Sequence, residues 1–233
     1  MKLIIFSDVH GNRYAFDAFI EDLPSYGREC EIIFLGDFFG YYYGTNEIID
    51  YCRRNELSCV LGNHDQYFLD ALDGRISIEE LVNKYGKSYE LALESVSNEN
   101  IEFLRQLDKS KIITSVNKKV YLCHGSPLDN LEGRIYPDTA LSVFDNVVSE
   151  FDYVVTGHTH HKIDRTYKNT VFLNPGSLGQ PRDGRGCSYL ILDLKKDVYD
   201  FYVVNYEIEK LENEIDRLDN GWSKLKSVLR RKP

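Results

Sequence analysis

All six histidines of this 233-residue chain lie in five short polar segments, each of which follows an apolar run. The segments are SDVHGN (7–12), GDFFG (36–40), GNHD (62–65), HGSP (124–127) and TGHTHH (156–161). Taken singly, each has an ordinary explanation as a turn or as a buried histidine paired with a carboxylate. Their common position at the ends of apolar runs favours one shared metal site, because aspartate, asparagine and histidine are ligands of divalent transition metals.

The types of the candidate ligands restrict both the metal and the number of ions. Asp8 alternates with His10, and His158 alternates with His160, so each pair points to one side of an extended segment. Two carboxylates, three or four imidazoles and one amide, with no thiolate, suit Mn, Fe, Ni, Co or Zn better than Ca or Mg. This set is too large for one ion and sufficient for two ions that share a carboxylate. Such a pair of ions stabilises the attacking and leaving oxygens of an in-line phosphoryl displacement.

The apolar runs and the periodic segments between them predict the elements that position these residues. The strands are predicted at 2–7, 32–35 and 58–61, and the helices over about 12–24 and 46–55. We expect Thr45 to cap the second helix. Because strands and helices alternate, the sheet is expected to be mainly parallel, and ligands bind beyond the carboxyl ends of parallel strands. The polar segments are therefore expected to meet at one edge of the sheet.

The remainder of the chain is predicted to add a helical insert, further strands and a helical tail to the same domain. The expected elements are the insert at about 66–110, a hairpin at 111–123 around Asn117-Lys118, a helix at about 137–150, a strand at 152–156, short strands over 162–204 and a helix-rich tail at about 205–233. The insert either covers the strand ends or packs as a layer against the sheet. Because no linker or internal repeat divides the chain, we predict a single domain over 1–233.

An apolar stripe in the tail could pack on the same chain or form a contact between two copies of it. It consists of Ile208, Leu211, Ile215 and Leu218. We expect this stripe to pack against the body of the protein, with a dimer contact as the alternative. The oligomeric state stays open.

Composition excludes several classes of protein. A net charge of −9 and a pI near 5.2 argue against extended binding along nucleic acids, which requires a basic stripe. No apolar stretch approaches the roughly 20 residues of a membrane span, and the first apolar run is too short for a signal peptide. The five cysteines lack any C-x-x-C spacing, so neither a disulfide framework nor a thiolate zinc site is indicated. We expect a reduced, cytoplasmic protein.

Taken in order, the five polar segments resemble the motifs of the calcineurin-like metallophosphoesterase superfamily. Three further segments resemble a small bacterial and archaeal subgroup: GYYYGTNEII (40–49), SNENIEFLRQL (97–107) and NPGSLGQPRDG (174–184). The resemblance spans nearly all of residues 1–193. It implies an α/β fold, namely a four-layer αββα sandwich with two mixed β-sheets, and a site that holds two divalent transition-metal ions.

The resemblance also assigns roles to individual residues. Asp8, His10 and His160 would bind one metal, Asp37 would bridge both metals, and Asn63, His124 and His158 would complete the second. His64 would contact the phosphate and protonate the leaving oxygen, since imidazole titrates in the appropriate range. The expected substrate-binding residues are Asn63, His64 and Arg182. His161 matches no motif position.

The chain departs from the pattern of the phosphoprotein phosphatases at two positions. Their GDxxDRG motif has an Asp and an Arg where this chain has Gly40 and Tyr41. This difference disfavours a phosphoprotein phosphatase, and equally a diadenosine tetraphosphate hydrolase. It leaves the orienting partner of His64 open, with Asp65 as a neighbour in sequence only. Arg182 is either a bidentate phosphate ligand or a solvated loop residue.

The favoured function is that of a metal-dependent phosphodiesterase. It would hydrolyse a small phosphate ester by in-line attack of a hydroxide that bridges two ions, with manganese among the candidate metals. A phosphomonoesterase and a cyclic-nucleotide phosphodiesterase are alternatives with the same chemistry. A further alternative is a non-catalytic interaction module such as the retromer subunit with this fold, which lacks the GNHD histidine that is present here as His64. No membrane partner and no extended nucleic-acid partner are expected.

Overall fold

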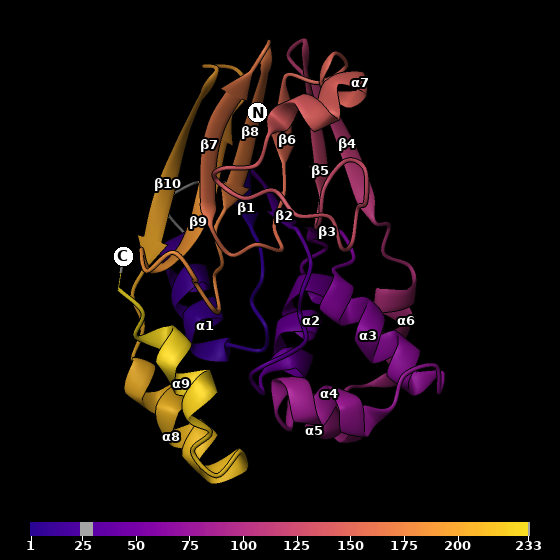
Figure 1. The fold of residues 1–233 in the computed structure, drawn as a ribbon, viewed down its shortest axis with the longest axis vertical. Helices are drawn as coiled ribbons and strands as arrows, with labels where there is room; N and C mark the ends of the chain where they lie inside the picture. The colour runs from indigo at the N-terminus through magenta and orange to yellow at the C-terminus, as the bar shows by residue number, and fades with distance from the viewer. Residues whose placement is uncertain (24–29, 233) are drawn as a thin grey trace.

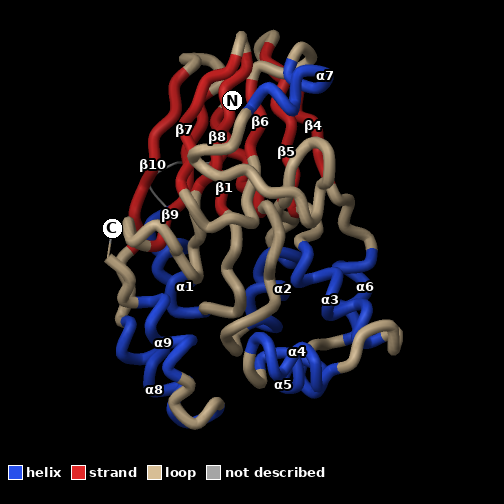
Figure 2. The backbone as a smooth tube through the Cα atoms, viewed as in Figure 1, coloured by secondary structure: helices blue, strands red, loops and turns tan. Residues whose placement is uncertain are grey.

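The computed structural model of the protein describes residues 1–23 and 30–232. Within these residues, two five-stranded sheets have the strand orders β10-β9-β1-β2-β3 and β4-β5-β6-β8-β7 (Figure 1). Figure 2 shows the strands gathered at one end of the molecule and most helices at the other, with loops between them. Both sheets are mixed, and helices pack on their outer faces, so the predicted α/β sandwich is confirmed.

The first sheet contains the three parallel strands that the sequence predicts. They are β1 (Lys2–Phe6), β2 (Cys30–Phe34) and β3 (Ser58–Cys59). On the side of β1 away from β2, the sheet continues with β9 (Cys187–Asp193) and then β10 (Val198–Val204). β1 pairs in parallel with β2, and β2 with β3, whereas β9 is antiparallel to both β1 and β10. The three parallel strands therefore end at the same edge.

The second sheet has a parallel centre between two antiparallel edge strands. Its strands are β4 (Ser110–Ser115), β5 (Lys118–Cys123), β6 (Tyr153–Val155), β7 (Lys162–Tyr167) and β8 (Thr170–Pro175). β5, β6 and β8 run in parallel. The β4–β5 hairpin turns at Val116 and Asn117, which both have positive φ, so the turn lies one residue before the predicted position.

Alternation along β1 separates two cores. Leu3 and Ile5 face the second sheet, and Ile4 and Phe6 face the helices. The helices on that side are α1 (Arg13–Asp22) and α2 (Thr45–Arg54), and the rings of Phe6 and Phe19 lie 4.7 Å apart. Burial of both faces of this strand explains its uninterrupted apolar sequence.

Two helix boundaries differ from the predictions. Gly44, not Thr45, is the N-cap of α2. The Thr45 hydroxyl donates to the Phe38 carbonyl (3.4 Å) and does not cap the first amides of the helix. The predicted end of the first helix reaches residue 24, which lies outside the described residues; α1 itself ends at Asp22.

Short helical turns cover the outer face of the second sheet where one longer helix was predicted. They are η2 (Leu141–Phe144) and α7 (Asp145–Val148), which pack through Phe144 on Phe172. The Thr139 hydroxyl accepts a hydrogen bond from the Tyr136 amide (2.8 Å), and this local turn replaces the first part of the predicted helix.

Four helices form the insert that connects β3 of the first sheet to β4 of the second along the chain. They are α3 (Asn63–Leu72), α4 (Ile78–Tyr85), α5 (Ser88–Ser95) and α6 (Asn98–Arg105). Leu81, Tyr89 and Leu104 join the core that lies between the first sheet and its helices. The insert thus begins at the GNHD segment itself.

The tail contains α8 (Ile208–Leu218) and α9 (Ser223–Leu229). Leu211 and Ile215 from α8 and Leu225 from α9 are buried around Tyr42. The apolar stripe of the tail therefore packs on the body of the same chain. Among the described residues, no helix is both long enough and apolar enough to cross a membrane.

Candidate metal centre

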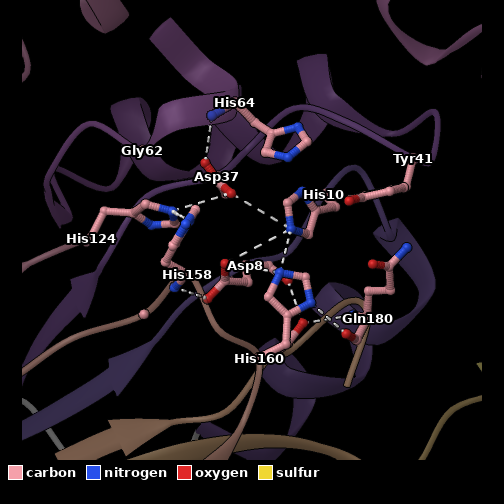
Figure 3. A network of polar contacts seen from close by, with 12 residues as sticks. Asp8, His10, Asp37, Tyr41, Gly62, His64, His124, His158, His160 and Gln180 are labelled. Atoms are coloured by element: carbon pink, nitrogen blue, oxygen red, sulfur yellow. Dashed lines mark hydrogen bonds and ion pairs between the residues drawn. The ribbon is translucent and has the colours of Figure 1, made fainter. Parts of the chain in front are cut away.

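The five polar segments converge where β1, β2, β3, β5 and β6 end (Figure 3). Backbone hydrogen bonds join the loops within each sheet: the Asp8 amide donates to the Gly36 carbonyl (3.0 Å), and the Gly157 amide to the His124 carbonyl (2.8 Å). The two sheets are connected by the His158 amide, which donates to Asp8 Oδ2 (3.1 Å). The loops therefore form one rigid unit.

Several side chains of this unit stand on backbone in the left-handed region. The residues, with their φ angles, are Asp8 (56°), His10 (50°), Asp37 (69°), Tyr41 (66°), His158 (65°) and His160 (58°). Non-glycine residues rarely adopt this conformation, which costs on the order of 1 kcal/mol each. The surrounding packing must hold the backbone in place so that these side chains point inward.

Asp8, His10 and His160 form the first group of the cluster. His160 Nε2 lies 3.2 Å from Asp8 Oδ1 and 3.0 Å from His10 Nε2. His10 Nε2 is also 3.8 Å from Asp8 Oδ1. All three side chains are almost completely excluded from solvent. Three potential ligand atoms thus surround one point in the interior.

The second group consists of Asp37, Asn63, His124 and His158. His124 Nε2 lies 2.9 Å from Asn63 Oδ1, 3.2 Å from His158 Nδ1 and 3.3 Å from Asp37 Oδ2. Asp37 Oδ2 is also 3.6 Å from His10 Nε2 in the first group. The carboxylate of Asp37 therefore lies between the two groups.

Backbone carbonyls fix the tautomers of three histidines. The Nδ1 atoms of His10, His124 and His160 lie 2.7, 2.8 and 2.6 Å from the carbonyl oxygens of Phe39, Leu35 and Gln180. A neutral ring that donates from Nδ1 has its lone pair on Nε2, which here faces the cluster. In neutral rings of this tautomer, the Nε2 atoms of His10 and His160 face each other as two acceptors at 3.0 Å, a contact that a cation between or beside them would stabilise.

His158 is oriented differently from the other three. Its Nδ1 faces the cluster, 3.0 Å from Asn63 Oδ1, and its Nε2 accepts a hydrogen bond from Arg134 Nε (3.0 Å). A ring that used the Nδ1 lone pair to hold a cation would have its proton on Nε2. Arg134 would then lose this acceptor.

Burial and the mutual charges of the cluster shift its pKa values. Burial opposes the ionisation of Asp8, but His160, then His124 and His10, outweigh this effect and hold the pKa of Asp8 well below its usual range. Burial lowers the pKa of His10 and of His160. Burial also acts to lower the pKa of His124, but the Asp37 carboxylate overcomes it and raises that pKa to about 10. The cluster thus attracts one positive charge even without a metal.

The donor set fits a divalent cation. Asp8 Oδ1 is buried and accepts no hydrogen bond, although a buried carboxylate oxygen without a partner is strongly unfavourable. Potential ligand atoms of Asp8, His10 and His160, and likewise of Asp37, His124 and His158, lie within 4.8 Å of one another. Nitrogen and oxygen donors without sulfur match transition metals of borderline hardness.

His64 lies beside the cluster, among aromatic rings. Its Nδ1 is 2.7 Å from the hydroxyl of Tyr89, whose oxygen is also 3.3 Å from the His64 carbonyl. Tyr89 belongs to α5, and its hydroxyl is the orienting partner that the sequence left open. Burial, followed by the charge of His10, lowers the pKa of His64.

Gly40 explains why an aspartate is absent at this position. A Cβ at residue 40 would lie 2.4 Å from His64 Nδ1, and its φ of +93° also favours glycine. The position that has an aspartate in the GDxxDRG motif is therefore in contact with His64 here as well. A helix of the insert supplies the hydrogen bond through Tyr89 instead.

Asp65 has a different function from orienting His64. Its carboxylate accepts hydrogen bonds from the amides of Gly62, Asp37 and Phe38, at 2.9, 2.9 and 2.7 Å. Asp65 thereby holds the GDFFG loop against the GNHD loop.

A cavity of about 250 Å³ opens over the cluster. Asp37, Asn63, His64, His158, His160 and Arg182 all line it. Arg182 Nη2 donates to the Tyr41 hydroxyl (3.0 Å), so the sequence-predicted arginine does reach the site. His161 lies outside the cluster, with Nδ1 2.6 Å from the Thr159 carbonyl.

Several residues around this cavity were missed at the level of sequence. Lys84, Arg134 and Lys224 line it, and Tyr89 positions His64. Each belongs to a helix or loop outside the five motifs, and no spacing rule links them to the strand ends. Tyr41, which stands where the GDxxDRG motif has its arginine, also lies on the cavity wall.

Comparison with known families gives one match over most of the chain. A model of the calcineurin-like phosphoesterase superfamily domain matches residues 1–197. A relative from Methanocaldococcus jannaschii, the uncharacterized protein MJ0912, is 31% identical over 234 residues, with 91% of each chain covered.

Solved structures match over nearly the full length. A metallophosphoesterase from Sphaerobacter thermophilus has a TM-score of 0.77 and 26% identity, with 98% of each chain covered. The hypothetical protein PH1004 from Pyrococcus horikoshii has a TM-score of 0.81 and 20% identity, covering 100% of this chain and 98% of that one. The fold is thus shared from end to end.

Proposed function

Because this chain belongs to the calcineurin-like phosphoesterase superfamily, we propose that it hydrolyses phosphodiesters with two divalent cations bound at the buried cluster. The observation that carries the proposal is the position of Asp37 between the two groups of ligand atoms, 3.6 Å from His10 Nε2 and 3.3 Å from His124 Nε2. One carboxylate can serve two cations in this position.

The two groups divide the proposed ligands. Asp8, His10 and His160 would hold one cation, and Asn63, His124 and His158 the other, with Asp37 shared. When bound, such cations supply Lewis-acid charge beside phosphorus and lower the pKa of water to near neutrality. Mn, Fe, Ni, Co and Zn all accept this donor set.

His64 is the proposed general acid. With Nδ1 at the Tyr89 hydroxyl, Nε2 is the ring nitrogen left to face the cavity. The lowered pKa keeps the free ring neutral, but a bound phosphate anion favours the imidazolium form. His64 would then donate from Nε2 to the leaving oxygen, while Nδ1–H donates to Tyr89.

Tyr89 suits both protonation states of His64. A hydroxyl donates one hydrogen bond and accepts others. It can donate to Nδ1 of the neutral ring, or accept from Nδ1–H of the imidazolium and donate to the His64 carbonyl. Tyr89 would thus keep the ring in one orientation through the reaction.

The cavity favours a diester over a monoester. It continues past Tyr41 and Arg182 into a second hollow, with which it shares these two residues together with Lys84 and Lys224. A phosphate at His64 can therefore have substituents on two sides. A module that only binds other proteins would not require an open cavity beside an acid.

The test is an assay of protein that is stripped of metal and reloaded with Mn²⁺ or Ni²⁺. We expect hydrolysis of bis(p-nitrophenyl) phosphate with a higher kcat/KM than that of p-nitrophenyl phosphate, and none after chelation. Metal analysis should give about two ions per chain. Preference for the monoester would overturn the diester assignment. Two bound ions with no turnover of any ester, cyclic nucleotides included, would favour the interaction module.

A further inference from the structure

A second hollow adjoins the cavity over the metal centre. We call it the distal cavity; it has a volume of about 250 Å³. It shares Tyr41, Lys84, Arg182 and Lys224 with the first cavity, so the two are continuous. Trp222, Leu225 and Val228 from the tail add an apolar wall.

The four cations that line the distal cavity come from separate parts of the chain. Lys84 belongs to α4, Arg182 to the loop after β8, Lys224 to α9, and Arg231 follows α9. Figure 1 shows α4 of the insert and α9 of the tail at the same end of the molecule, on opposite sides. Packing of the tail on Tyr42 brings these charges together.

These positive charges are not neutralised by carboxylates. Within residues 1–23 and 30–232, Lys84, Arg182, Lys224 and Arg231 have no Asp or Glu partner at ion-pair distance. No acidic residue lines the distal cavity. Neighbouring cations on the tail are paired, since Lys226 lies 2.5 Å from Asp216.

The positive charge of the distal cavity contrasts with the negative net charge of the whole chain. The net charge is −9, yet the wall of one cavity gathers like charges that repel each other. Lys84 lies over Tyr85 (4.9 Å) and Lys224 over Trp222 (5.5 Å), but such contacts leave the charge in place. A bound anion would remove the repulsion.

We propose that the distal cavity binds a second phosphate group of the substrate, attached through an organic body to the ester that is cleaved at His64. This inference rests on the proposed phosphodiesterase function. Arg231 lines only the distal cavity, so this cavity has a cation of its own. The apolar wall with Trp222 suits the organic body, and Arg182 and Lys224 lie between the two compartments.

Trp222 allows a binding test that needs no turnover, because it is the only tryptophan of the chain. Its fluorescence is titrated in metal-free protein with thymidine 3′,5′-bisphosphate and, separately, with thymidine 5′-monophosphate. We expect the bisphosphate to bind at least tenfold more tightly, with an affinity that falls as salt rises. Equal affinities would overturn the proposal.

Variants of the tail provide the matched controls. In a Lys224→Ala, Arg231→Ala double variant, the ratio of the affinities for the bisphosphate and the monophosphate should fall to about twofold or less. Lys224→Arg should retain the ratio of the parent. Lys226→Ala removes a charge from the same helix but outside both cavities, and should behave like the parent. If Lys226→Ala also lost the preference for the bisphosphate, the preference would reflect the overall charge of the tail. That result would contradict a defined phosphate site in the distal cavity.

An assay of two esters separates this inference from the proposed function. The 5′-p-nitrophenyl ester of thymidine 5′-phosphate is compared with the same ester carrying a 3′-phosphate, using metal-loaded protein. We expect KM to be at least tenfold lower for the second compound. If neither ester is cleaved, the proposed function fails. If both are cleaved with equal KM, only the second phosphate site is refuted.

Discussion

The metal centre and the distal cavity are adjacent, but they are built in opposite ways. The metal centre is formed by loops at strand ends, with short side chains on strained backbone and almost no exposure to solvent. The distal cavity is formed by helices and loops that project long side chains such as Lys84 and Arg231 into a solvated hollow. The first arrangement fixes the positions of its ligand atoms, and the second gathers positive charge on long side chains.

This difference separates chemistry from selectivity. Ligand atoms of a metal must be held in place before the metal arrives, and buried loops with satisfied backbone groups can do this. Recognition of a substrate tolerates movement, so flexible cations on separate helices suffice. The cations of the tail lie beyond residues 1–197, which the superfamily model matches. Changes in the two regions should therefore have effects of different kinds.

The strongest test of the rigid region is Asp37→Asn. Loss of the shared carboxylate should reduce kcat on bis(p-nitrophenyl) phosphate by more than about 1000-fold and the metal content to about one ion per chain or less. Asp193→Asn is the matched control. The Asp193 carboxylate accepts a hydrogen bond from the Lys195 amide (3.0 Å) in a turn that is not part of the metal centre. An Asp37→Asn protein with full metal content and activity would remove the basis of the comparison.

The acid beside the rigid region is tested by His64→Ala. We expect kcat on an unactivated diester to fall by more than about 100-fold with metal content retained, because imidazole supplies the proton for the leaving oxygen. His161→Ala removes a histidine outside the cluster and should leave the rate unchanged. A His64→Ala protein as active as the parent would contradict the assigned role.

The burial of the rigid region predicts an unusual dependence of stability on pH. Burial lowers the pKa of His10, His64 and His160, and lowers that of His158 to about 3. Below pH 6.5 the unfolded chain binds protons that these folded histidines do not bind, so the four histidines lower the free energy of unfolding as the pH falls. The raised pKa values of Asp37 and Asp65 oppose part of this loss. His124, with its pKa raised to about 10, acts oppositely and loses its stabilising contribution between pH 6.5 and 10.

The measurement is urea unfolding of metal-free protein across this range. We expect maximum stability near pH 6.5 and a loss of at least about 2 kcal/mol on lowering the pH to 5. A gain in stability on acidification would mean that the histidines are not buried as neutral groups. Metal should raise stability most at neutral pH, because protons compete for the same nitrogens at low pH.

The smallest of these effects is expected for Tyr89→Phe. The ring of Tyr89 packs in the core and would stay, but His64 Nδ1 would lose its partner. We expect kcat to fall about tenfold and the acidic limb of the pH–rate profile to shift, with KM nearly unchanged. A loss of stability with an unchanged pH profile would indicate that Tyr89 is only a core residue.

Much of the rigid region could be predicted because its pattern is local. Apolar runs that end in polar clusters predicted β1, β2 and β6 and placed Asp8, Asp37 and His158 at their ends. Asp8 and His10 do share one group, but left-handed backbone at both residues places them there, not the two-residue alternation of an extended segment that the sequence suggested. The short helical turns at 141–148 were mispredicted as one longer helix, because residues 136–139 close a separate turn through the Thr139 hydroxyl and amide.

By itself, the sequence determined that three strands separated by helices lie in a largely parallel arrangement, and which ligand types follow them, since periodicity and residue type are local properties. Only the tertiary structure decided that Tyr89 orients His64, that backbone carbonyls set the histidine tautomers, and that the tail brings Lys224 and Arg231 to the site. The physical reason is distance along the chain: Tyr89 lies 25 residues from His64, and Arg231 lies 49 residues from Arg182. Such contacts are selected by the packing of whole helices, which no local spacing encodes.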